Sequence, residues 1–469
     1  MKGVRRFVFL LHMLGEIQYK YNTNERSCVK IGQMKIDHHE KEHTLLMDMT
    51  FFSAPLKGTI SAPASKSEAH RRMICAGLTK GATTLDGFMD SADMAATARC
   101  LKALGAKIER EEDRLTVTGY AKKISKLPVL DCGESGSTLR FFVPIALALA
   151  NGGVFRMHGR LGQRPMDVYR DLFVPRGVRW RMGVGCDGAA ELTVKGELEP
   201  GHYVMPGNVS SQFVSGLLFA LPLLEADSTL TVEPPVESAD FIRMTVEALL
   251  QSGIQLEETA PFSWRISGNQ TYQAKDTQLS GDYSQAAVLL CAGALGHDIT
   301  VTQLEKETTQ GDRAVLAHLE ALGAETTEDA SGVTVTVEKL TGATLDMANC
   351  PDIAPILALV CQMAEGESRL AGCGRLRLKE CDRLAATVET LNLLGGCAKA
   401  EGDTIVIRGV KELKGGVTLP DYNDHRMVML GMIAASIARE PVTVTGVEAL
   451  NKSWPEFVNV YQNLGGKAE

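Results

Sequence analysis

The stretch GDYSQAAVLLCAGAL, residues 281–295, places a short polar turn directly before a run of apolar residues. The same order occurs six times along the chain, at intervals of about 70 residues, and such a period indicates a repeated supersecondary unit. The polar turns are Ser-Lys-Ser (65–67), Gly-Glu-Ser-Gly-Ser (133–137), Ser-Ser-Gln (210–212), Gly-Asp-Tyr-Ser (281–284), Pro-Asp-Ile (351–353) and Asn-Asp-His-Arg (423–426). The apolar runs predict helices, and a helix that is apolar on all sides is predicted to be buried.

Five of the six copies of the unit have the same predicted elements in the same order. A strand precedes the polar turn, and a strand, a second helix and a hairpin follow the apolar helix, which gives a βαβαββ unit. Several second helices end in Leu followed by Gly, as at Leu104-Gly105, Leu322-Gly323 and Leu394-Gly395, and Gly favours the left-handed conformation that ends a helix. The sequence therefore predicts an α/β fold of two domains with three units each, with the first helices inside and the sheets outside.

The sixth copy is incomplete, because the chain ends before its hairpin. We expect the segment 51–63, which has strand character, to cross over and complete the sheet of that unit. The predicted domains are then residues 65–280, and residues 47–64 together with residues 281–469. We interpret residues 1–46 as a disordered N-terminal extension, with Met34 and Met47 as candidate natural starts.

Composition argues against several classes of function. The 469 residues carry a net charge of −8, so we expect no general affinity for nucleic acid. The eleven cysteines form no Cys-x-x-Cys pair, which is typical of a reduced cytoplasmic protein. The histidines are scattered along the chain, and we expect no metal site. No stretch is apolar for long enough to span a membrane, so we expect no membrane partner.

Basic residues recur where the predicted first and second helices begin. They are Lys66, Arg71, Arg140, Arg164, Lys379, Arg383, Arg426 and Lys452. Capping explains Ser and Asp at such positions, but Lys and Arg are unfavourable at the positive end of a helix dipole. Their recurrence indicates a ligand with phosphate or carboxylate groups. Two acids in this set, Asp352 and Glu380, either serve as acid and base or only pair with neighbouring cations.

Five motifs are arranged along the chain in a recognisable order. They are Pro-Ala-Ser-Lys-Ser (63–67), Leu-Gly-Gln-Arg-Pro-Met (161–166), Val-Ser-Ser-Gln-Phe (209–213), Leu-Lys-Glu-Cys-Asp-Arg-Leu (378–384) and Tyr-Asn-Asp-His-Arg-Met (422–427). This set resembles the enolpyruvyl transferase family, in its shikimate branch, over about residues 50–469. The resemblance implies the family's inside-out α/β barrel in two domains. It also implies transfer of the enolpyruvyl group of phosphoenolpyruvate to the 5-hydroxyl of shikimate 3-phosphate.

The resemblance further implies the residues of two substrate sites. Shikimate 3-phosphate would be bound by Lys66, Ser67, Arg71, Ser210, Ser211, Gln212, Ser238, Asp352 and Lys379. Phosphoenolpyruvate would be bound by Lys66, Gly136, Arg164, Gln212, Arg383, Arg426 and Lys452. Asp352 would take the proton of the 5-hydroxyl, Glu380 would protonate the methylene carbon, and Lys66 is a third candidate for a proton step. The reaction needs no metal or redox cofactor, and a monomer is expected.

Three positions depart from the pattern of the family. Glu134 stands where many members have Asn. Phe241 stands where many have a Tyr that can bond the acceptor's phosphate, and Arg375 stands where some have Asn. Gly136 leaves room for glyphosate, which mimics phosphoenolpyruvate in this family, so we expect the protein to be inhibited by glyphosate.

Two other functions stay open on the sequence alone. A sister enzyme of the family transfers the same group to UDP-N-acetylglucosamine. The motifs at 210–212 and 423–426 favour the shikimate branch instead, and Cys132 alone lies near the place of the sister enzyme's catalytic acid. A non-catalytic repeat protein that binds phosphorylated ligands would use the same cations, although it would gain nothing from Asp352 and Glu380.

Overall fold

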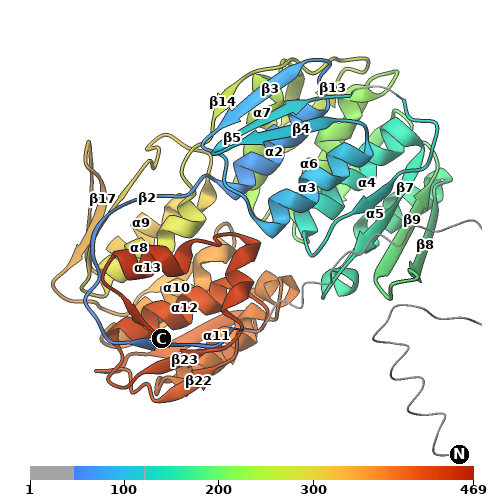
Figure 1. Cartoon of the computed structure of the whole chain (residues 1–469). Coiled ribbons are helices and arrows are strands. Elements are labelled where there is room, and N and C mark those ends of the chain that lie inside the picture. Colours follow the sequence, from blue (N-terminus) through green and yellow to red (C-terminus); the bar gives the residue numbers. More distant parts are fainter. Residues whose placement is uncertain (1–46, 121–122) are drawn as a thin grey trace, which may run out of the picture. The chain divides into compact units, whose positions relative to one another are not determined.

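The computed structural model describes residues 47–120 and 123–469. The expected extension at residues 1–46, with its candidate start Met34, lies outside the described residues. The described part contains six four-stranded sheets (Figure 1). Each sheet has one pair of parallel strands at one edge. The remaining neighbouring strands of each sheet are antiparallel. The six copies predicted from the sequence are therefore six repeats of one sheet.

The six sheets share one arrangement of strands from edge to edge. In that order, the sheets of the first three repeats contain β14 (Thr277–Gln278), β3 (Ala82–Asp86), β5 (Arg114–Thr118) and β4 (Lys107–Glu111); β6 (Val129–Asp131), β7 (Gly152–Met157), β9 (Ala190–Lys195) and β8 (Arg179–Val184); and β10 (His202–Pro206), β11 (Ser228–Glu233), β13 (Ser263–Ile266) and β12 (Leu256–Ala260). The sheets of the last three contain β2 (Lys57–Ser61), β15 (Asp298–Thr302), β17 (Gly332–Val337) and β16 (Ala324–Asp329); β18 (Thr344–Asp346), β19 (Glu367–Ala371), β21 (Thr404–Arg408) and β20 (Ala398–Glu401); and β22 (Val417–Leu419), β23 (Val442–Val444), β1 (Met49–Phe52) and β24 (Lys467–Ala468).

Each repeat has two helices. The first helices are α2 (Lys66–Gly77), α4 (Gly136–Ala150), α6 (Ser211–Ala220), α8 (Tyr283–Ala294), α10 (Ala354–Met363) and α12 (His425–Ile437). The second helices are α3 (Ala92–Ala103), α5 (Asp167–Phe173), α7 (Ala239–Gln251), α9 (Val315–Ala321), α11 (Arg383–Leu393) and α13 (Phe457–Asn463). Short 3-10 helices are η1 (Leu161–Gln163), η2 (Val174–Arg176), η3 (Leu221–Leu223), η4 (Gly311–Ala314), η5 (Pro351–Ile353), η6 (Gly374–Leu378) and η7 (Val447–Lys452).

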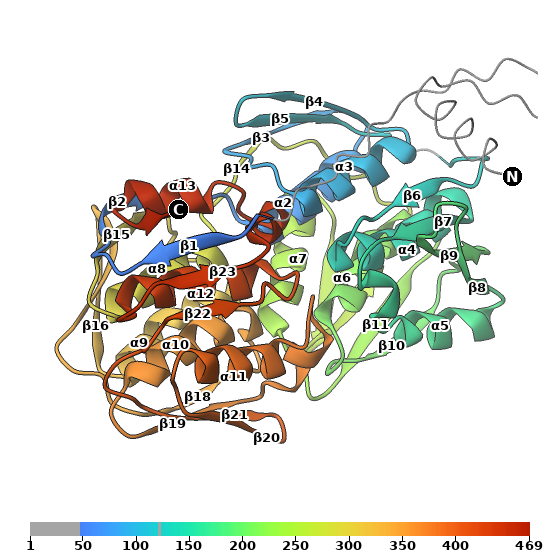
Figure 2. The ribbon, with the colours of Figure 1, turned by 60° about the horizontal axis from the view of Figure 1, so that its bottom comes forward.

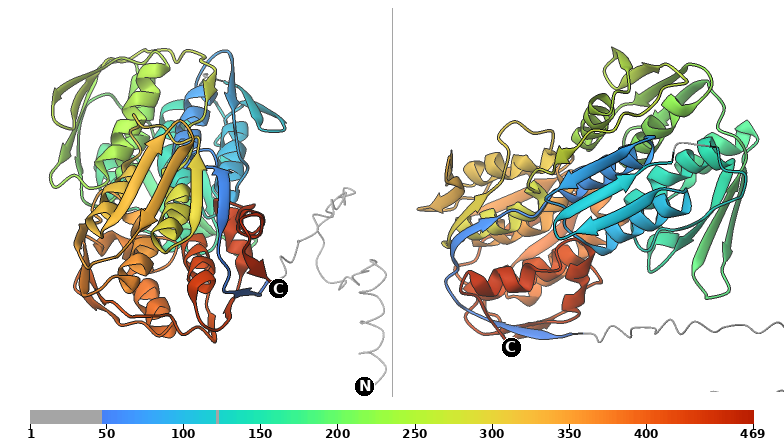
Figure 3. Two further views of the ribbon diagram at one scale, coloured as in Figure 1. Left: turned by 90° about the vertical axis from the view of Figure 1, so that its left-hand side faces the viewer. Right: turned by 45° about the horizontal axis from the view of Figure 1, so that its top comes forward.

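The N-terminal strands pair with late repeats, as Figure 2 and Figure 3 show for the blue segment beside red and yellow strands. β1 lies between β23 and β24, which confirms that an N-terminal strand completes the sixth sheet. Two details of the prediction were wrong. β2 pairs with β15 of the fourth sheet instead of the sixth, and the chain end itself supplies β24. In the first repeat the parallel partner of β3 is β14. These pairings were not predicted, because the parallel partner of a strand depends on tertiary packing and not on the strand's own pattern.

The chain passes between the first three and the last three repeats at two neighbouring places. Ala64 and Gly281 form an antiparallel bridge. The N–H of Ser65 donates to the carbonyl of Ser280 at 2.7 Å, and the N–H of Asp282 donates to the carbonyl of Pro63 at 2.8 Å. The two passages are therefore joined by backbone hydrogen bonds.

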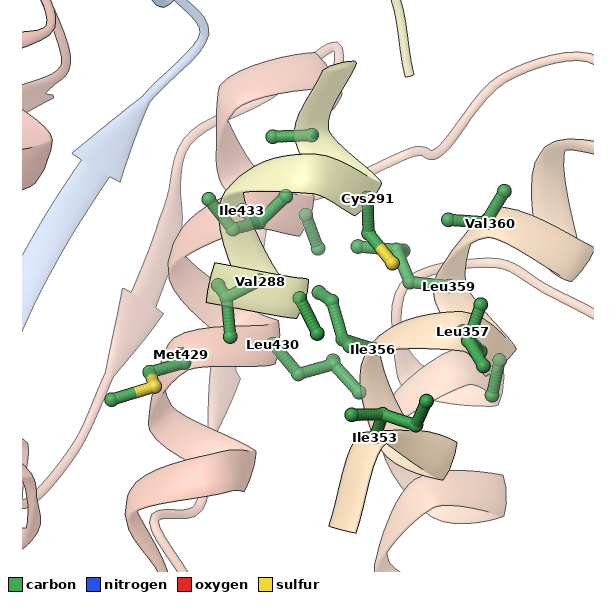
Figure 4. Packing of buried hydrophobic residues seen from close by; sticks show 14 of the residues in the cluster. Val288, Cys291, Ile353, Ile356, Leu357, Leu359, Val360, Met429, Leu430 and Ile433 are labelled. Atoms are coloured by element: carbon green, nitrogen blue, oxygen red, sulfur yellow. The ribbon is translucent and has the colours of Figure 1, made fainter. Parts of the chain in front are cut away.

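Two buried hydrophobic clusters follow the same division. One is formed by residues between 69 and 279, and the other by residues 51–62 and 283–464. In the second cluster α8, α10 and α12 pack against one another through side chains such as Val288, Ile356 and Leu430 (Figure 4). We propose that these cores mark the two domains at the predicted bounds.

The described residues show no helix that combines the length and apolar character needed to cross a bilayer. The cysteines of this part of the chain are free thiols, and most of them are buried.

Candidate active site

The polar turns cap the first helices of five repeats. The side chains of Ser65, Ser135, Ser210, Asp282 and Asp424 accept hydrogen bonds from backbone N–H groups in the first turns of α2, α4, α6, α8 and α12. Capping thus accounts for these Ser and Asp residues. The turn of the fifth repeat differs, because it forms η5 ahead of α10, and η5 carries Asp352.

Helix starts from both groups of repeats line one cleft of about 1030 Å³. The predicted site residues in its lining are Lys66, Ser67, Arg71, Gly136, Arg164, Ser210, Ser211, Gln212, Ser238, Asp352, Lys379, Glu380, Arg383 and Arg426. Lys452 does not belong to this lining, but its Nζ lies 3.2 Å from Oε2 of Glu134 and its charge acts on Glu380. Residues chosen from positions far apart in the sequence therefore meet in one place.

Arg383 is the centre of the acidic part of the cleft. Its guanidinium lies 2.7 Å from an oxygen of Asp352, 2.8 Å from one of Glu380 and 2.7 Å from one of Asp424. Arg383 is only 1% exposed. Burial acts to lower its pKa, yet the three carboxylates raise that pKa well above its ordinary value. The role of Asp424 as a partner of Arg383 was not predicted, because only the fold brings the two together.

Asp352 is held in its charged form by its neighbours. Burial acts to raise the pKa of its carboxyl, but Lys379 and Arg383 lower that pKa well below its usual range. The Nζ of Lys379 donates to Oδ1 of Asp352 at 2.8 Å. The pairing that the sequence left as an alternative is therefore present. It is compatible with a role as base, since an anionic ligand that attracts Lys379 and Arg383 would raise the pKa of Asp352.

Glu380 contacts cations from both groups of repeats. One carboxylate oxygen lies 2.8 Å from Nη2 of Arg383, and the other lies 3.7 Å from Nη1 of Arg164. Burial acts to raise the pKa of Glu380, but the charges of Arg383 and Arg164 lower it well below its usual range. Two ionised acids thus lie among the cations of the cleft.

In the first three repeats, Arg71 and Arg140 bond to neutral groups of the cleft. Arg71 donates from Nη1 to the carbonyl of Ser67 at 2.7 Å, and burial lowers its pKa to about 9. Arg140 donates to Oε1 of Gln212 at 2.6 Å. Burial and then the charge of Arg164 lower the pKa of Arg140 well below its ordinary value. An anion bound here would relieve the repulsion between these cations.

Lys66 pairs with Asp93, an acid that the sequence did not assign to the site. Its Nζ lies 2.8 Å from Oδ2 of Asp93, which is buried near the start of α3. Burial acts to raise the pKa of Asp93, but Lys66 and Lys452 lower it below its ordinary value. Its place at a helix start was visible in the sequence, but its partners were not.

Two of the departures from the family pattern meet near Ser238. The Nη1 of Arg375 donates to Oγ of Ser238 at 2.8 Å, and its Nε lies 3.7 Å from Glu237. Phe241 lines the same cleft, with the guanidinium of Arg71 at 5.9 Å from its ring centre. Arg375 therefore brings a cation close to the position where the Tyr hydroxyl is missing.

The third departure, Glu134, contacts the last repeat. It forms the ion pair with Lys452 and accepts a hydrogen bond at 3.1 Å from Nδ2 of Asn423. Its neighbour Gly136 lies against Arg164, because a Cβ at Gly136 would approach Nη1 of Arg164 to 2.7 Å. This corner of the cleft leaves little room for a side chain at position 136.

Six βαβαββ repeats around a cleft of cations and paired carboxylates are the architecture of the enolpyruvyl transferases. The fold is similar to that of EPSP synthase from Acinetobacter baumannii, with a TM-score of 0.74 and 22% identity over 90% of this chain and 99% of that one. It is also similar to the enolpyruvyl transferase NikO from Streptomyces tendae, with a TM-score of 0.72 and 19% identity over 90% and 98%. At these identities the likeness establishes the fold alone.

The sequence places the chain more closely. The family model described as EPSP synthase (3-phosphoshikimate 1-carboxyvinyltransferase) matches residues 52–461. A 3-phosphoshikimate 1-carboxyvinyltransferase from Clostridium beijerinckii is 38% identical over 89% of this chain and 98% of that protein. One from Clostridioides difficile is 36% identical over 90% and 98%. The chain belongs to the EPSP synthase family, which confirms the resemblance drawn from its motifs.

Proposed function

We propose that this chain transfers the enolpyruvyl group of phosphoenolpyruvate to the 5-hydroxyl of shikimate 3-phosphate. The products are 5-enolpyruvylshikimate 3-phosphate and phosphate, in the shikimate pathway to chorismate and the aromatic amino acids. Membership of the EPSP synthase family over residues 52–461 carries the proposal. The relatives named 3-phosphoshikimate 1-carboxyvinyltransferase support it.

The acceptor site is proposed around Arg71, whose guanidinium bonds to neutral groups. Its residues are Lys66, Ser67, Arg71, Ser210, Ser211, Gln212, Ser238, Asp352 and Lys379. Hydroxyl groups and buried guanidinium groups suit a phosphate, because charge-assisted hydrogen bonds to it are strong. Arg375, bonded to Ser238, adds a cation there in place of the donor that Phe241 lacks.

The donor site is proposed between the two groups of repeats. Its residues are Lys66, Gly136, Arg164, Gln212, Arg383, Arg426 and Lys452. Phosphoenolpyruvate carries a carboxylate and a phosphate, and several Arg and Lys side chains can bind both at once. Donor binding would draw Arg383 partly away from Asp352 and Glu380 and so raise the pKa of each acid.

The proton steps follow from these positions. The 5-hydroxyl oxygen bonds to C2 of phosphoenolpyruvate as Asp352 takes the hydroxyl proton and Glu380 protonates the methylene carbon, which becomes a methyl group. Lys66, close to both substrates, stabilises charge or carries a proton. Glu380 then takes back a methyl proton as the C–O bond to phosphate breaks, which restores the double bond, and the phosphate leaves with the proton that Asp352 had taken. Alignment of two substrates in one cleft lowers the barrier, because the reacting groups lose their freedom before the reaction.

We also propose that the protein acts as a monomer in the cytoplasm. The free cysteines of the described residues suit a reducing compartment.

One assay tests the proposed function. Phosphate release from phosphoenolpyruvate is measured with shikimate 3-phosphate and, in parallel, with UDP-N-acetylglucosamine as the acceptor. Turnover with shikimate 3-phosphate alone is expected. Turnover with UDP-N-acetylglucosamine instead would assign the sister reaction, and binding of both anions without phosphate release would identify a non-catalytic binding protein.

A further inference from the structure

Asp312 is a buried acid that the proposed mechanism does not use. It lies in η4 of the fourth repeat and is 1% exposed. Its Oδ2 accepts a hydrogen bond from Oγ of Ser284. Its Oδ1 is also buried and has no hydrogen-bond partner among the described residues. A carboxyl group in this environment needs an explanation, since burying an unpaired polar atom is costly.

Ser284 connects Asp312 to the proposed donor site. It stands in the first turn of α8 and lines the cleft. Its backbone carbonyl accepts a hydrogen bond from Nη1 of Arg426, and the same nitrogen donates to Oε1 of Gln285 at 3.3 Å. Acceptors at the start of α8 thus position the buried guanidinium of Arg426.

The segment that carries Asp312 holds the start of α8 at a second point. Oε1 of Gln310 accepts a hydrogen bond from the N–H of Tyr283 at 3.0 Å. Nε2 of Gln310 donates to the carbonyl of Gly281 at 2.7 Å. Gln310 bonds to the backbone before Ser284, and Asp312 bonds to the hydroxyl of Ser284. The segment therefore fixes the position of the Ser284 carbonyl that accepts from Arg426.

We propose that Asp312 is a positioning residue for Arg426, acting through Ser284. The inference rests on the proposed function, in which Arg426 binds phosphoenolpyruvate. Asp312 is not among the residues proposed to contact substrate. We therefore expect it to affect donor binding through Arg426.

The charges that surround Asp312 make its proposed effect on Arg426 depend on pH. They come from Asp282 before α8, Asp352 on η5 and Arg426 on α12. The Cys350 thiol before η5 is a further titratable group nearby, and burial raises its pKa and keeps it neutral. Burial first, and then the charge of Asp352, raise the pKa of Asp312 to about 7, although Ser284 and Arg426 act to lower it. Below that pH Asp312 is neutral, and above it a new negative charge faces Arg426. Donor binding should therefore weaken as the pH rises through 7.

The test is the KM for phosphoenolpyruvate between pH 6 and 8.5, compared among three proteins. In the native protein this KM should rise roughly tenfold, the effect of one pKa unit of coupling. In Asp312→Asn, which stays neutral, the Asp312-dependent rise should be lost. In Ser284→Ala the midpoint of the rise should move to higher pH, because a bond that lowers the pKa of Asp312 is removed. Comparing variants cancels the titration of phosphoenolpyruvate itself.

Controls separate this inference from a general loss of structure. Asp329→Asn, on the neighbouring exposed hairpin, should keep the native pH dependence. If Asp312→Asn does not fold, the midpoint of Ser284→Ala decides alone. The inference is overturned if Asp312→Asn keeps the native pH dependence, or if Ser284→Ala leaves the midpoint unchanged. Absence of native turnover would overturn the proposed function instead, and calorimetric binding of phosphoenolpyruvate over the same pH range would then decide the role of Asp312.

Discussion

Two buried arginines on opposite sides of the cleft, Arg71 and Arg383, have different kinds of partner. On the side of the first three repeats, Arg71 donates to the carbonyls of Ser67 and Phe241 and to the hydroxyl of Thr245. On the side of the last three, Arg383 pairs with three carboxylates. The charge of Arg71 thus meets neutral groups, whereas that of Arg383 meets three carboxylates.

This difference separates binding from proton transfer. A cation bonded to neutral groups attracts an anion whatever the state of the acids nearby. A cation shared by carboxylates also sets their pKa, so a ligand that competes for it changes whether they hold protons. We infer that the first side holds the acceptor's phosphate, whereas the second side responds to the donor.

The largest effect should come from removing the two acids of the second side. Asp352→Ala and Glu380→Gln should each lower kcat by about 10²- to 10⁴-fold, because each removes one proton-transfer group. Steady-state phosphate release measures the loss. Asp403→Asn, an exposed acid that also lies near an Arg, should keep native kcat. Near-native rates in either cleft variant would remove the role assigned to that residue.

A somewhat smaller effect should follow from removing the cation they share. Arg383→Met leaves three carboxylates without their buried partner and should lower the free energy of unfolding by about 3–5 kcal/mol. Urea denaturation measures this change. Arg377→Met removes only exposed contacts, the pairs with Asp382 and Asp403 and a hydrogen bond to the carbonyl of Gly402, and should cost less than about 1 kcal/mol. Equal stability of the two variants would mean that the network does not stabilise the fifth and sixth repeats, which supply its residues.

A third effect concerns the space between the two sides. Gly136→Ala places a Cβ against Arg164 and should raise the KM for phosphoenolpyruvate roughly tenfold, since small displacements of binding groups are costly. Glyphosate should inhibit the native protein and should inhibit this variant less. Gly183→Ala, where a Cβ would meet nothing within 4 Å, is the matched control. Full native activity in millimolar glyphosate would contradict the expected inhibition.

The smallest effect is the pH dependence of stability, because it appears only in acid. Asp352 and Glu380 have a lower pKa in the folded protein than in the unfolded chain. Their contribution is complete above the unfolded values, near pH 4, and is lost as the pH falls through the folded values below. The Tm of the native protein should therefore fall more steeply below pH 4 than that of Asp352→Asn. Parallel curves would mean that Asp352 adds no net stability.

The sequence predicted the repeats because their signals are local. A polar turn followed by an apolar run can be recognised from the residues of a single helix and its start. The cations at the helix starts were found in the same way. Fourteen of the fifteen predicted site residues line the cleft, and Lys452 lies beside it.

The partners within the site were not predictable, because they lie far apart along the chain. Asp424 and Arg383 are separated by 41 residues, and Lys66 and Asp93 by 27. The pairing of β2 with β15 was not predicted, for the same reason. Asp312 had the weakest signal, since Ser284, which donates to its carboxylate, is an ordinary residue type for a helix start.

The neighbouring passages at Ala64 and Gly281 have a consequence for how such a chain can be assembled. Residues 65–280 contain every strand of the first three sheets, and residues 47–64 with 281–469 contain every strand of the other three. Because residues 64 and 281 already lie side by side, a direct link between them would leave the second set continuous. The topology is that of one three-repeat protein inserted into a loop of another, with each keeping its own strands.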